Sequence, residues 1–186
     1  NIAELDQLVD EILLSSRLDA READVGTVEL VDLIGLAAEE CARVDAELDV
    51  TAVPEGLEVR GVAKLLRRAL RNLLENARRY SQGDITVVLQ RHDGQAQLSV
   101  LDRGPGVPSA LRERIFEPFY RLPGASERAG GVGLGLALVR SIAQRHNGSV
   151  RCEDQPDGSG GACFVLRLPL HSPPGTAAPA PQRKGT

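Results

Sequence analysis

The sequence predicts an α/β protein, a two-layer α/β sandwich in which helices cover one face of a mixed sheet. Residues 62–80 repeat apolar side chains at helical spacing, which predicts a long amphipathic helix. Residues 84–91 and 95–102 are rich in β-branched and apolar side chains, and the turn between them contains Asp93 and Gly94. Such a pair of segments is a strong signal for a β-hairpin. The switch from helical to strand periodicity indicates both layers of the sandwich.

Residues 1–19 predict a helix with an apolar stripe. Ile2, Leu5, Val9 and Ile12 recur at alternating three- and four-residue steps, with acidic residues between them. This stripe is typical of a coiled coil or a helical bundle, so the helix is expected to pack against a further segment or a second subunit. The alternative is an ordinary helix packed on the core of its own domain.

The remaining elements follow from the same patterns. In chain order they are a helix at 30–46, a short strand at 47–54, a short helix at 108–116, a helix after Gly133, and strands at 148–154 and 161–169. Residues 171–186 are rich in Pro and lack apolar periodicity, which predicts a disordered tail. We therefore expect a bundle helix at 1–20, a domain at 21–170 and a tail at 171–186.

Composition excludes several classes of function. The 186 residues are 42% hydrophobic with a net charge of −4, and no dense run of Lys or Arg precedes the tail, so a general nucleic-acid binder is not expected. No segment approaches the roughly 18 consecutive apolar residues of a membrane span, so no membrane contact is expected. The Cys residues lack the spacing of a disulfide framework or a zinc site, which favours a reducing cytoplasm. Position 1 is not Met, so we expect a piece of a longer protein.

The stretch GGVGLGLALV at residues 130–139 concentrates Gly immediately before an apolar helical pattern. Its glycines let a ligand approach the main chain, and the helix that follows presents unpaired N–H groups and the positive end of its dipole. A phosphate is the ligand that suits this arrangement. The stretch lacks the Lys of a P-loop and the third Gly of a dinucleotide fingerprint, so another architecture is expected. The alternative is a glycine-rich turn without a ligand.

Two amides interrupt the long helix. Asn72 and Asn76 lie one turn apart and share a face, where their side-chain oxygens could hold a hydrated Mg²⁺ together with substrate phosphates. The alternative is that neighbouring carbonyl groups satisfy both amides. Arg79 and Tyr80, one turn further on, offer a positive charge and an aromatic surface.

The second hairpin strand runs into LDRGPGVP. Asp102 closes the strand, and Gly104 and Gly106 bracket a tight turn. A carboxylate at the floor of a site can accept a hydrogen bond from an exocyclic amine, which would select adenine over guanine. The alternative is an Asp that caps the turn. The segment IFEPFYR at 115–121 follows and ends in Arg121, and its Phe residues act either as the hinge of a mobile loop or as a local hydrophobic cluster.

The order and spacing of four of these motifs resemble a known family. The motifs are Asn72-x-x-x-Asn76, Asp102-x-Gly104-x-Gly106, the segment 116–121 and Gly131-x-Gly133-x-Gly135. They look like the N, G1, F and G2 boxes of the sensor histidine kinases of bacterial two-component systems, over residues 1–170. The resemblance implies a Bergerat-type ATP-binding sandwich, shared with gyrase B subunits, MutL proteins and the ninety-kilodalton heat-shock chaperones.

The resemblance also implies a role for each motif in binding ATP and Mg²⁺. Asn76, helped by Asn72, would coordinate Mg²⁺, and Arg79 would contact phosphate. Tyr80 would stack near adenine and Asp102 would bind its amino group. The remaining contacts would come from Gly104 and Gly106 around the adenine, from Arg121 at the γ-phosphate, from a lid at 118–130, and from the main-chain amides of Gly131, Val132, Gly133, Leu134, Gly135 and Leu136 around the triphosphate.

Phosphoryl transfer to a histidine is the implied reaction. Related hydrolases carry a catalytic Glu where this chain has Asn72, and an amide cannot act as a base; Glu75 is expected to point elsewhere on the helix. None of the His residues matches the family's acceptor pattern, so the acceptor is expected upstream of Asn1. Residues 1–20 would then be the last part of a dimerisation hairpin, which implies a homodimer, a response regulator as partner, and a cytoplasmic position in a membrane sensor.

The sequence departs from the family pattern at two further positions. Ala162 stands where a Thr is usual, and Val62 where an Asp is common. Two other functions stay open: a nucleotide-gated module that is not a kinase, either an ATPase clamp or a pseudokinase, and a Ser-directed anti-sigma kinase of related fold. The dimerisation-type helix at 1–20 and Asn72 favour the histidine kinase.

Overall fold

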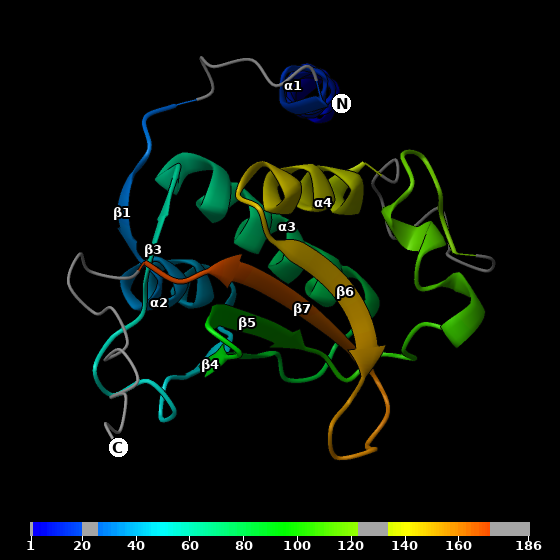
Figure 1. Cartoon of the computed structure of the whole chain (residues 1–186). Helices are drawn as coiled ribbons and strands as arrows, with labels where there is room; N and C mark the ends of the chain where they lie inside the picture. Colours follow the sequence, from blue (N-terminus) through cyan, green and yellow to red (C-terminus); the bar gives the residue numbers. More distant parts are fainter. Residues whose placement is uncertain (1, 20–25, 123–133, 172–186) are drawn as a thin grey trace, which may run out of the picture.

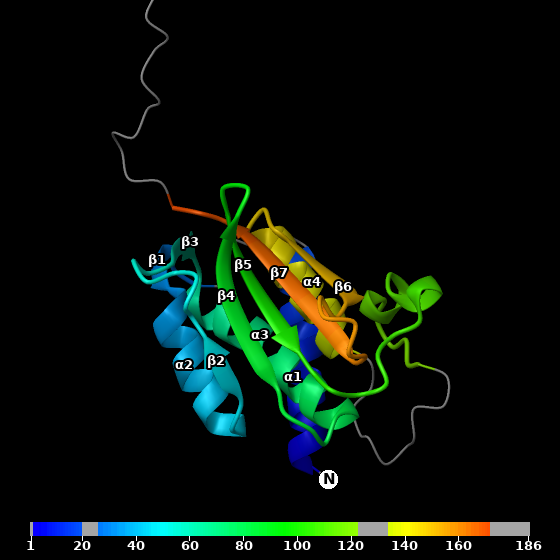
Figure 2. The same ribbon diagram turned by 90° about the horizontal axis from the view of Figure 1, so that it is seen from below.

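The computed structural model describes residues 2–19, 26–122 and 134–171. A five-stranded mixed sheet with the order β2-β4-β5-β7-β6 forms one layer (Figure 1). Its strands are β2 (Glu47–Asp49), β4 (Thr86–His92), β5 (Gln95–Leu101), β6 (Ser149–Asp154) and β7 (Ala162–Pro169). β2 pairs with β4 in parallel, and the other neighbours are antiparallel. Figure 2 shows α3 and α4 behind the strands of this sheet and α2 beside its β2 edge, and this arrangement confirms the predicted fold class.

The second layer consists of α2 (Leu33–Val44), α3 (Ala63–Tyr80) and α4 (Gly135–Arg145). α3 is central, and its buried side chains include Leu65, Leu66, Ala69, Leu70, Leu73, Leu74 and Ala77. These residues recur at helical spacing, so burial of one face stabilises the helix against the sheet. The predicted long helix and the hairpin are both confirmed, and the hairpin turns through Asp93 and Gly94 in positive-φ conformations.

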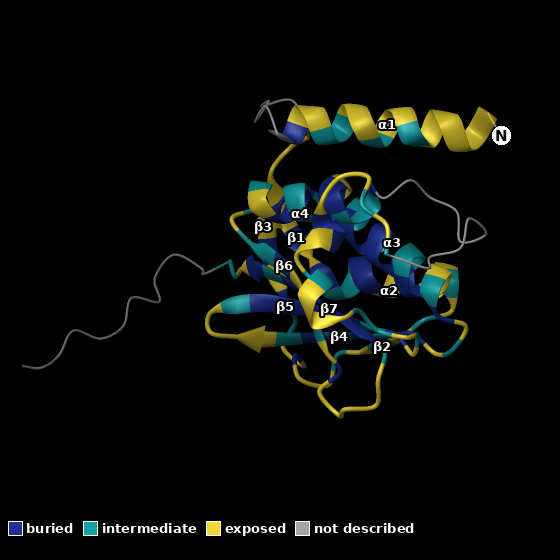
Figure 3. Cartoon of the chain, turned by 90° about the vertical axis from the view of Figure 1, so that its right-hand side faces the viewer, coloured by how far each residue is buried: buried dark blue, intermediate teal, exposed yellow. Residues whose placement is uncertain are grey.

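Helix α1 (Ile2–Asp19) lies across the outer side of the helical layer, away from the sheet (Figure 3). Glu11 forms an ion pair with Arg68 of α3 at 3.2 Å, and Leu18 is buried. Much of the predicted apolar stripe stays exposed: Ile2, Leu5, Val9 and Ile12 have exposed fractions of 43% or more. Within the described ranges, no helix combines the length and apolarity needed to cross a membrane.

A small second sheet was not predicted. Strands β1 (Glu29–Asp32) and β3 (Glu58–Gly61) pair in antiparallel register beside the main sheet. The helix expected at 30–46 therefore begins only at Leu33, because Asp32 ends β1 and caps the helix by accepting a hydrogen bond from the Ile34 N–H at 3.0 Å. Each strand has four residues, too short for an alternating pattern to stand out.

Two further predicted elements were wrong in type or length. The segment 108–116 forms two 3₁₀ turns, Ser109–Leu111 and Arg114–Phe116, because Glu117 precedes Pro118 and takes an extended conformation. The strand expected to run to Pro54 ends at Asp49. There the Asp49 carboxylate accepts hydrogen bonds from the main-chain N–H and the hydroxyl of Thr51, which favours a turn.

Candidate functional site

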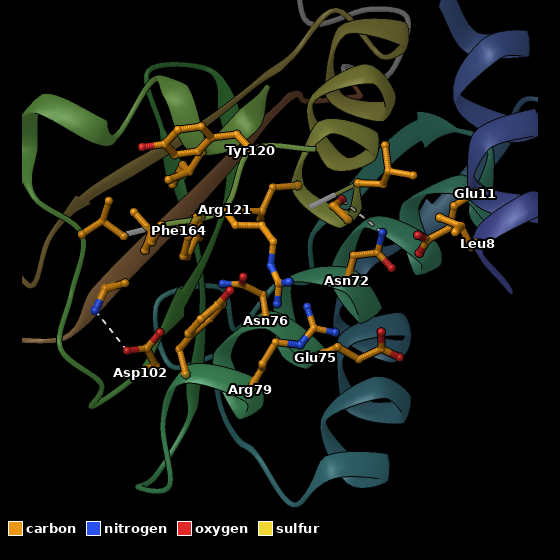
Figure 4. Close-up of a pocket in the computed structure, with 18 of the residues that line it drawn as sticks. Leu8, Glu11, Asn72, Glu75, Asn76, Arg79, Asp102, Tyr120, Arg121 and Phe164 are labelled. Carbon is orange, nitrogen blue, oxygen red and sulfur yellow. Dashed lines mark hydrogen bonds between the residues drawn. The ribbon is translucent and has the colours of Figure 1, made fainter. Parts of the chain in front are cut away.

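A cavity of about 850 Å³ opens between α3, α4, the turn after β5 and helix α1 (Figure 4). It brings together most of the residues predicted from the sequence. The predicted residues that line it are Asn72, Asn76, Arg79, Tyr80, Asp102, Gly106, Arg121, Leu134, Gly135 and Leu136. Gly104 does not line the cavity, and its N–H bonds to the Asp102 carboxylate. Gly131, Val132 and Gly133 lie outside the described residues, as does most of the expected lid.

One wall of the cavity comes from a single face of α3. Asn72, Asn76 and Tyr80 follow at four-residue steps, so their side chains stack along the helix toward the cavity. Asn72 is buried, and its side-chain nitrogen donates a hydrogen bond to the Gly135 carbonyl at 3.2 Å. This contact ties the cavity wall to the first turn of α4. Figure 4 shows the guanidinium groups of Arg79 and Arg121 pointing into the same cavity.

Asp102 forms the floor at the opposite end. The side chain is 3% exposed, and its Oδ1 accepts hydrogen bonds from the N–H groups of Gly104 at 2.9 Å and Ala162 at 3.1 Å. The Asp102 N–H in turn donates to the Ala162 carbonyl at 3.0 Å, which extends the pairing of β5 with β7. Because the Gly104 and Ala162 hydrogen bonds both end on Oδ1, the second carboxylate oxygen keeps acceptor capacity for a donor in the cavity.

Two glycines allow the backbone to close around Asp102. A Cβ atom on Gly104 would lie 2.5 Å from the Tyr80 carbonyl oxygen, and one on Gly161 would lie 2.1 Å from the Asp102 carbonyl oxygen. Both distances are shorter than van der Waals contact allows. Gly104 was predicted from the sequence, whereas Gly161 was not, although it lies in the glycine-rich stretch GSGG at 158–161.

Apolar side chains cover the part of the cavity between Asp102 and α4. Ile115, Leu134 and Phe164 line this part, and Phe116 packs edge to face on Phe164 with ring centroids 6.2 Å apart. Phe116 thereby belongs to the main core rather than to a separate cluster. Phe119, by contrast, is 63% exposed and has a positive φ of 65°. An apolar slot above a buried carboxylate suits a flat heteroaromatic ring with a polar edge.

The structure adds residues that the sequence analysis missed. Leu8 and Glu11 of α1 line the cavity beside Asn72, although nothing in the N-terminal pattern points to a pocket. Glu75 was expected to point elsewhere on the helix, and this was wrong, because Glu75 also lines the cavity; Figure 4 shows its carboxylate pointing away from Asp102. Among the residues that the structure describes, no cluster of three or more His, Cys, Asp or Glu side chains forms a metal site.

Comparison with known proteins decides the family. A family model described as histidine kinase-, DNA gyrase B-, and HSP90-like ATPase matches residues 61–172. The chain belongs to this ATPase family. The matched range contains the α3 wall, Asp102 and the start of α4, so the family assignment and the cavity coincide in the chain.

The relatives place this ATPase domain among the sensor histidine kinases. SenX3, a sensor-like histidine kinase of Mycolicibacterium smegmatis, is 35% identical over 179 residues, which cover 91% of this chain and 46% of SenX3. The solved structure of the mycobacterial sensor histidine kinase MprB has a TM-score of 0.66 and 32% identity, and the match covers 77% of this chain and 98% of that one. The chain spans less than half the length of SenX3.

A third relative carries a nucleotide. The full-length ShkA structure in complex with AMPPNP has a TM-score of 0.72 and 26% identity, covering 91% of this chain and 36% of ShkA. These findings confirm the resemblance drawn from the four motifs. By family the chain is a histidine kinase-, DNA gyrase B-, and HSP90-like ATPase domain, and the relatives that it resembles are named sensor histidine kinases.

Proposed function

We propose that this domain binds Mg-ATP in the cavity and transfers the γ-phosphoryl group to a histidine outside the 186 residues, for relay to an Asp of a response regulator. The observation that carries the proposal is that position 72 is an Asn whose side chain is hydrogen-bonded to Gly135. Its amide nitrogen donates to the Gly135 carbonyl, and an amide has no basic site with which to activate water. The cavity therefore favours holding ATP for transfer over hydrolysing it.

Each wall of the cavity has a part in this proposal. Asp102 accepts a hydrogen bond from the exocyclic amine of adenine, and the apolar slot beside Phe164 holds the ring. Arg79 and Arg121 neutralise phosphate charge, and the main-chain amides at the start of α4 bind phosphate oxygens.

The side-chain oxygen of Asn76 fits the needs of Mg²⁺, which takes few protein ligands and fills its shell with water and phosphate oxygens. When bound, the ion would offset charge on the phosphate oxygens during transfer. Asn72, whose nitrogen is engaged with Gly135, supports this site from the neighbouring turn. The protein itself positions the γ-phosphorus for in-line attack by an imidazole nitrogen, as the bond to the bridging oxygen of ADP breaks and the imidazole N–H proton leaves.

Helix α1 supports the proposed assembly of the parent protein. Its apolar residues at positions 2, 5, 9 and 12 are exposed on the helix surface. An exposed stripe of this kind is suited to a helical bundle, so we propose a homodimer formed through this helix and its upstream partner. The domain would then work in the cytoplasm, as one part of a membrane-bound sensor.

The deciding experiment incubates the parent protein, and separately this chain, with γ-labelled ATP and Mg²⁺. A protein-bound label that is acid-labile and base-stable, on the parent alone, is the expected phosphohistidine. Free phosphate without bound label would instead show an ATPase clamp, and tight ATP binding without either product would show a pseudokinase. In parallel, Asn76→Ala is expected to remove the Mg²⁺ dependence of ATP affinity in calorimetry. Asn147→Gly is the control, because Asn147 is exposed and has a positive φ.

A further inference from the structure

A buried glutamine, Gln155, forms hydrogen bonds with the main chain of the residues at the floor of the cavity. Gln155 lies in the loop between β6 and β7, and 9% of its surface is exposed. Its side-chain nitrogen donates to the carbonyl oxygen of Asp102 at 2.7 Å and to that of Ala162 at 3.2 Å. Gln155 therefore uses both donors of its amide on the two residues that shape the floor. Gln155 itself does not line the cavity.

These two carbonyls belong to residues that also bond to each other. Asp102 donates its N–H to the Ala162 carbonyl, and Ala162 donates its N–H to the Asp102 carboxylate. Gln155 directly follows the last residue of β6, so it bonds to both carbonyls from the loop that leads toward β7. Without the amide, the Asp102 carbonyl would lose a short buried hydrogen bond, and the peptide unit after Asp102 would keep only the hydrogen bond from the Arg103 N–H to the Ser81 hydroxyl at 3.2 Å.

We propose that Gln155 is a positioning residue that sets the direction of the Asp102 carboxylate and thereby the preference for adenine over purines that lack the exocyclic amine. The inference rests on the proposed contact between Asp102 and that amine. Asp102 is the residue proposed to contact the adenine ring, and Gln155 acts through Asp102 by bonding to its main-chain carbonyl. Side-chain direction matters because hydrogen bonds weaken steeply when donor and acceptor are misaligned.

The test compares the affinities of Mg-ATP and Mg-ITP, because ITP carries an oxygen in place of the exocyclic amine. Gln155→Met keeps the side-chain length and removes the amide. It is expected to weaken ATP binding about three- to tenfold, the range that one buried hydrogen bond covers, and to leave ITP binding unchanged. Gln155→Glu replaces the donor with a carboxylate facing two carbonyls and is expected to reduce the selectivity at least as much. It also serves if the Met variant fails to fold, as judged by thermal unfolding.

Gln97→Met is the matched control. Gln97 is equally buried in β5, where its side-chain oxygen accepts a hydrogen bond from Arg167 at 3.0 Å, at the far end of the strand from Asp102. Its loss is expected to leave the ratio of ATP to ITP affinity unchanged. Equal weakening of ATP and ITP by Gln155→Met would show a purely structural role and overturn the inference.

Asp102→Asn separates this inference from the proposed function. The variant is expected to lose its preference for ATP, because an amide nitrogen then faces the amine. If Asp102→Asn loses the preference and the Gln155 variants keep it, the inference is wrong and the proposed contact stands. If Asp102→Asn still prefers ATP to the same degree, Asp102 does not bind the exocyclic amine, and both the proposed contact and the Gln155 inference are wrong.

Discussion

The side-chain nitrogen of Asn72 donates to the carbonyl oxygen of Gly135 across 3.2 Å, although the two residues are 63 positions apart in the chain. The bond joins α3 to the first turn of α4, which carries the main-chain groups expected to meet phosphate. The two walls of the cavity are therefore coupled through one amide. A displacement of the first turn of α4 is therefore expected to move Asn72 of α3, and a displacement of Asn72 is expected to move that turn.

Asn72→Ala is expected to weaken ATP binding about five- to tenfold, since it removes one neutral hydrogen bond and leaves a carbonyl without its donor. Asn72→Asp should be worse, because a carboxylate would face the Gly135 carbonyl. Isothermal titration calorimetry measures both, with Asn147→Gly as the exposed control. Affinity for ATP at the level of the unchanged protein in Asn72→Asp would show that this bond does not support the site.

His146 provides a pH-dependent contact between α4 and α3. Its Nε2 accepts a hydrogen bond from the Val62 N–H at 3.0 Å, and its Nδ1 lies 2.7 Å from the Ile142 carbonyl, so the neutral ring with the proton on Nδ1 fits both. The contact serves the N-terminal end of α3, where Val62 has no capping side chain. Burial, and secondarily the nearby Arg145 charge, hold the pKa of His146 below its usual value, against the opposing effect of the Ile142 contact.

Stability should therefore fall as the pH drops from about 6.5 toward the lowered pKa of His146, since the unfolded chain takes up a proton more readily there. Above pH 6.5 this contribution is fully present. Urea unfolding between pH 5 and 8 measures the slope, and His146→Gln should reduce it in that interval. His92→Gln is the control, because His92 lies exposed in the hairpin. An unchanged slope in His146→Gln would contradict the assignment.

A buried carboxylate joins α2 to α3. Glu40 is 2% exposed and receives two hydrogen bonds from Arg71, at 2.8 and 3.0 Å, and a third from Arg67 at 3.2 Å. The Arg71 hydrogen bond is the largest cause that lowers the pKa of Glu40, followed by Arg67 and the charges of Arg71 and Arg43, against desolvation. Removing one partner of such a pair leaves the other charges uncompensated.

Glu40→Ala is expected to lower the free energy of unfolding by about 3 kcal/mol, at the lower end for a broken buried pair because both arginines reach solvent. Glu39→Ala is the matched control: Glu39 is the neighbouring carboxylate, 65% exposed and paired with Arg67, and should cost about 0.5 kcal/mol. The Glu40 contribution should disappear as the pH falls below about 4.5, through its lowered pKa. Equal losses in the two variants at neutral pH would contradict this account.

A partly buried ion pair between Glu11 and Arg68 contributes to the position of α1, which also packs against α4. Glu11→Gln removes the negative partner of Arg68 and should increase hydrogen exchange in α1 several-fold, while α3 stays protected. Asp10→Asn is the control, because Asp10 is exposed on the same helix. If α1 exchanges equally fast in both variants and in the unchanged chain, the pair does not hold the helix on the domain.

Local patterns in the sequence determined α3, the β4–β5 hairpin and most of the predicted residues that line the cavity. The apolar spacing of α3 and the Asp93–Gly94 turn each involve neighbours along the chain, so periodicity and turn chemistry report them directly. The spacing of the Asn72, Asp102 and Gly131 motifs indicated a histidine kinase ATPase domain, and the family comparison confirmed it.

The tertiary structure alone decided how distant segments meet. β1 and β3 are too short for a strand pattern to be recognised in the sequence. They form by pairing with each other, although α2 lies between them in the chain. The docking of α1 beside the cavity, the Gln155 support behind Asp102 and the His146 contact at α3 all join residues more than 50 positions apart. Such contacts leave no periodic trace, because their free energy comes from burial and hydrogen-bond satisfaction that exist only once the layers have packed.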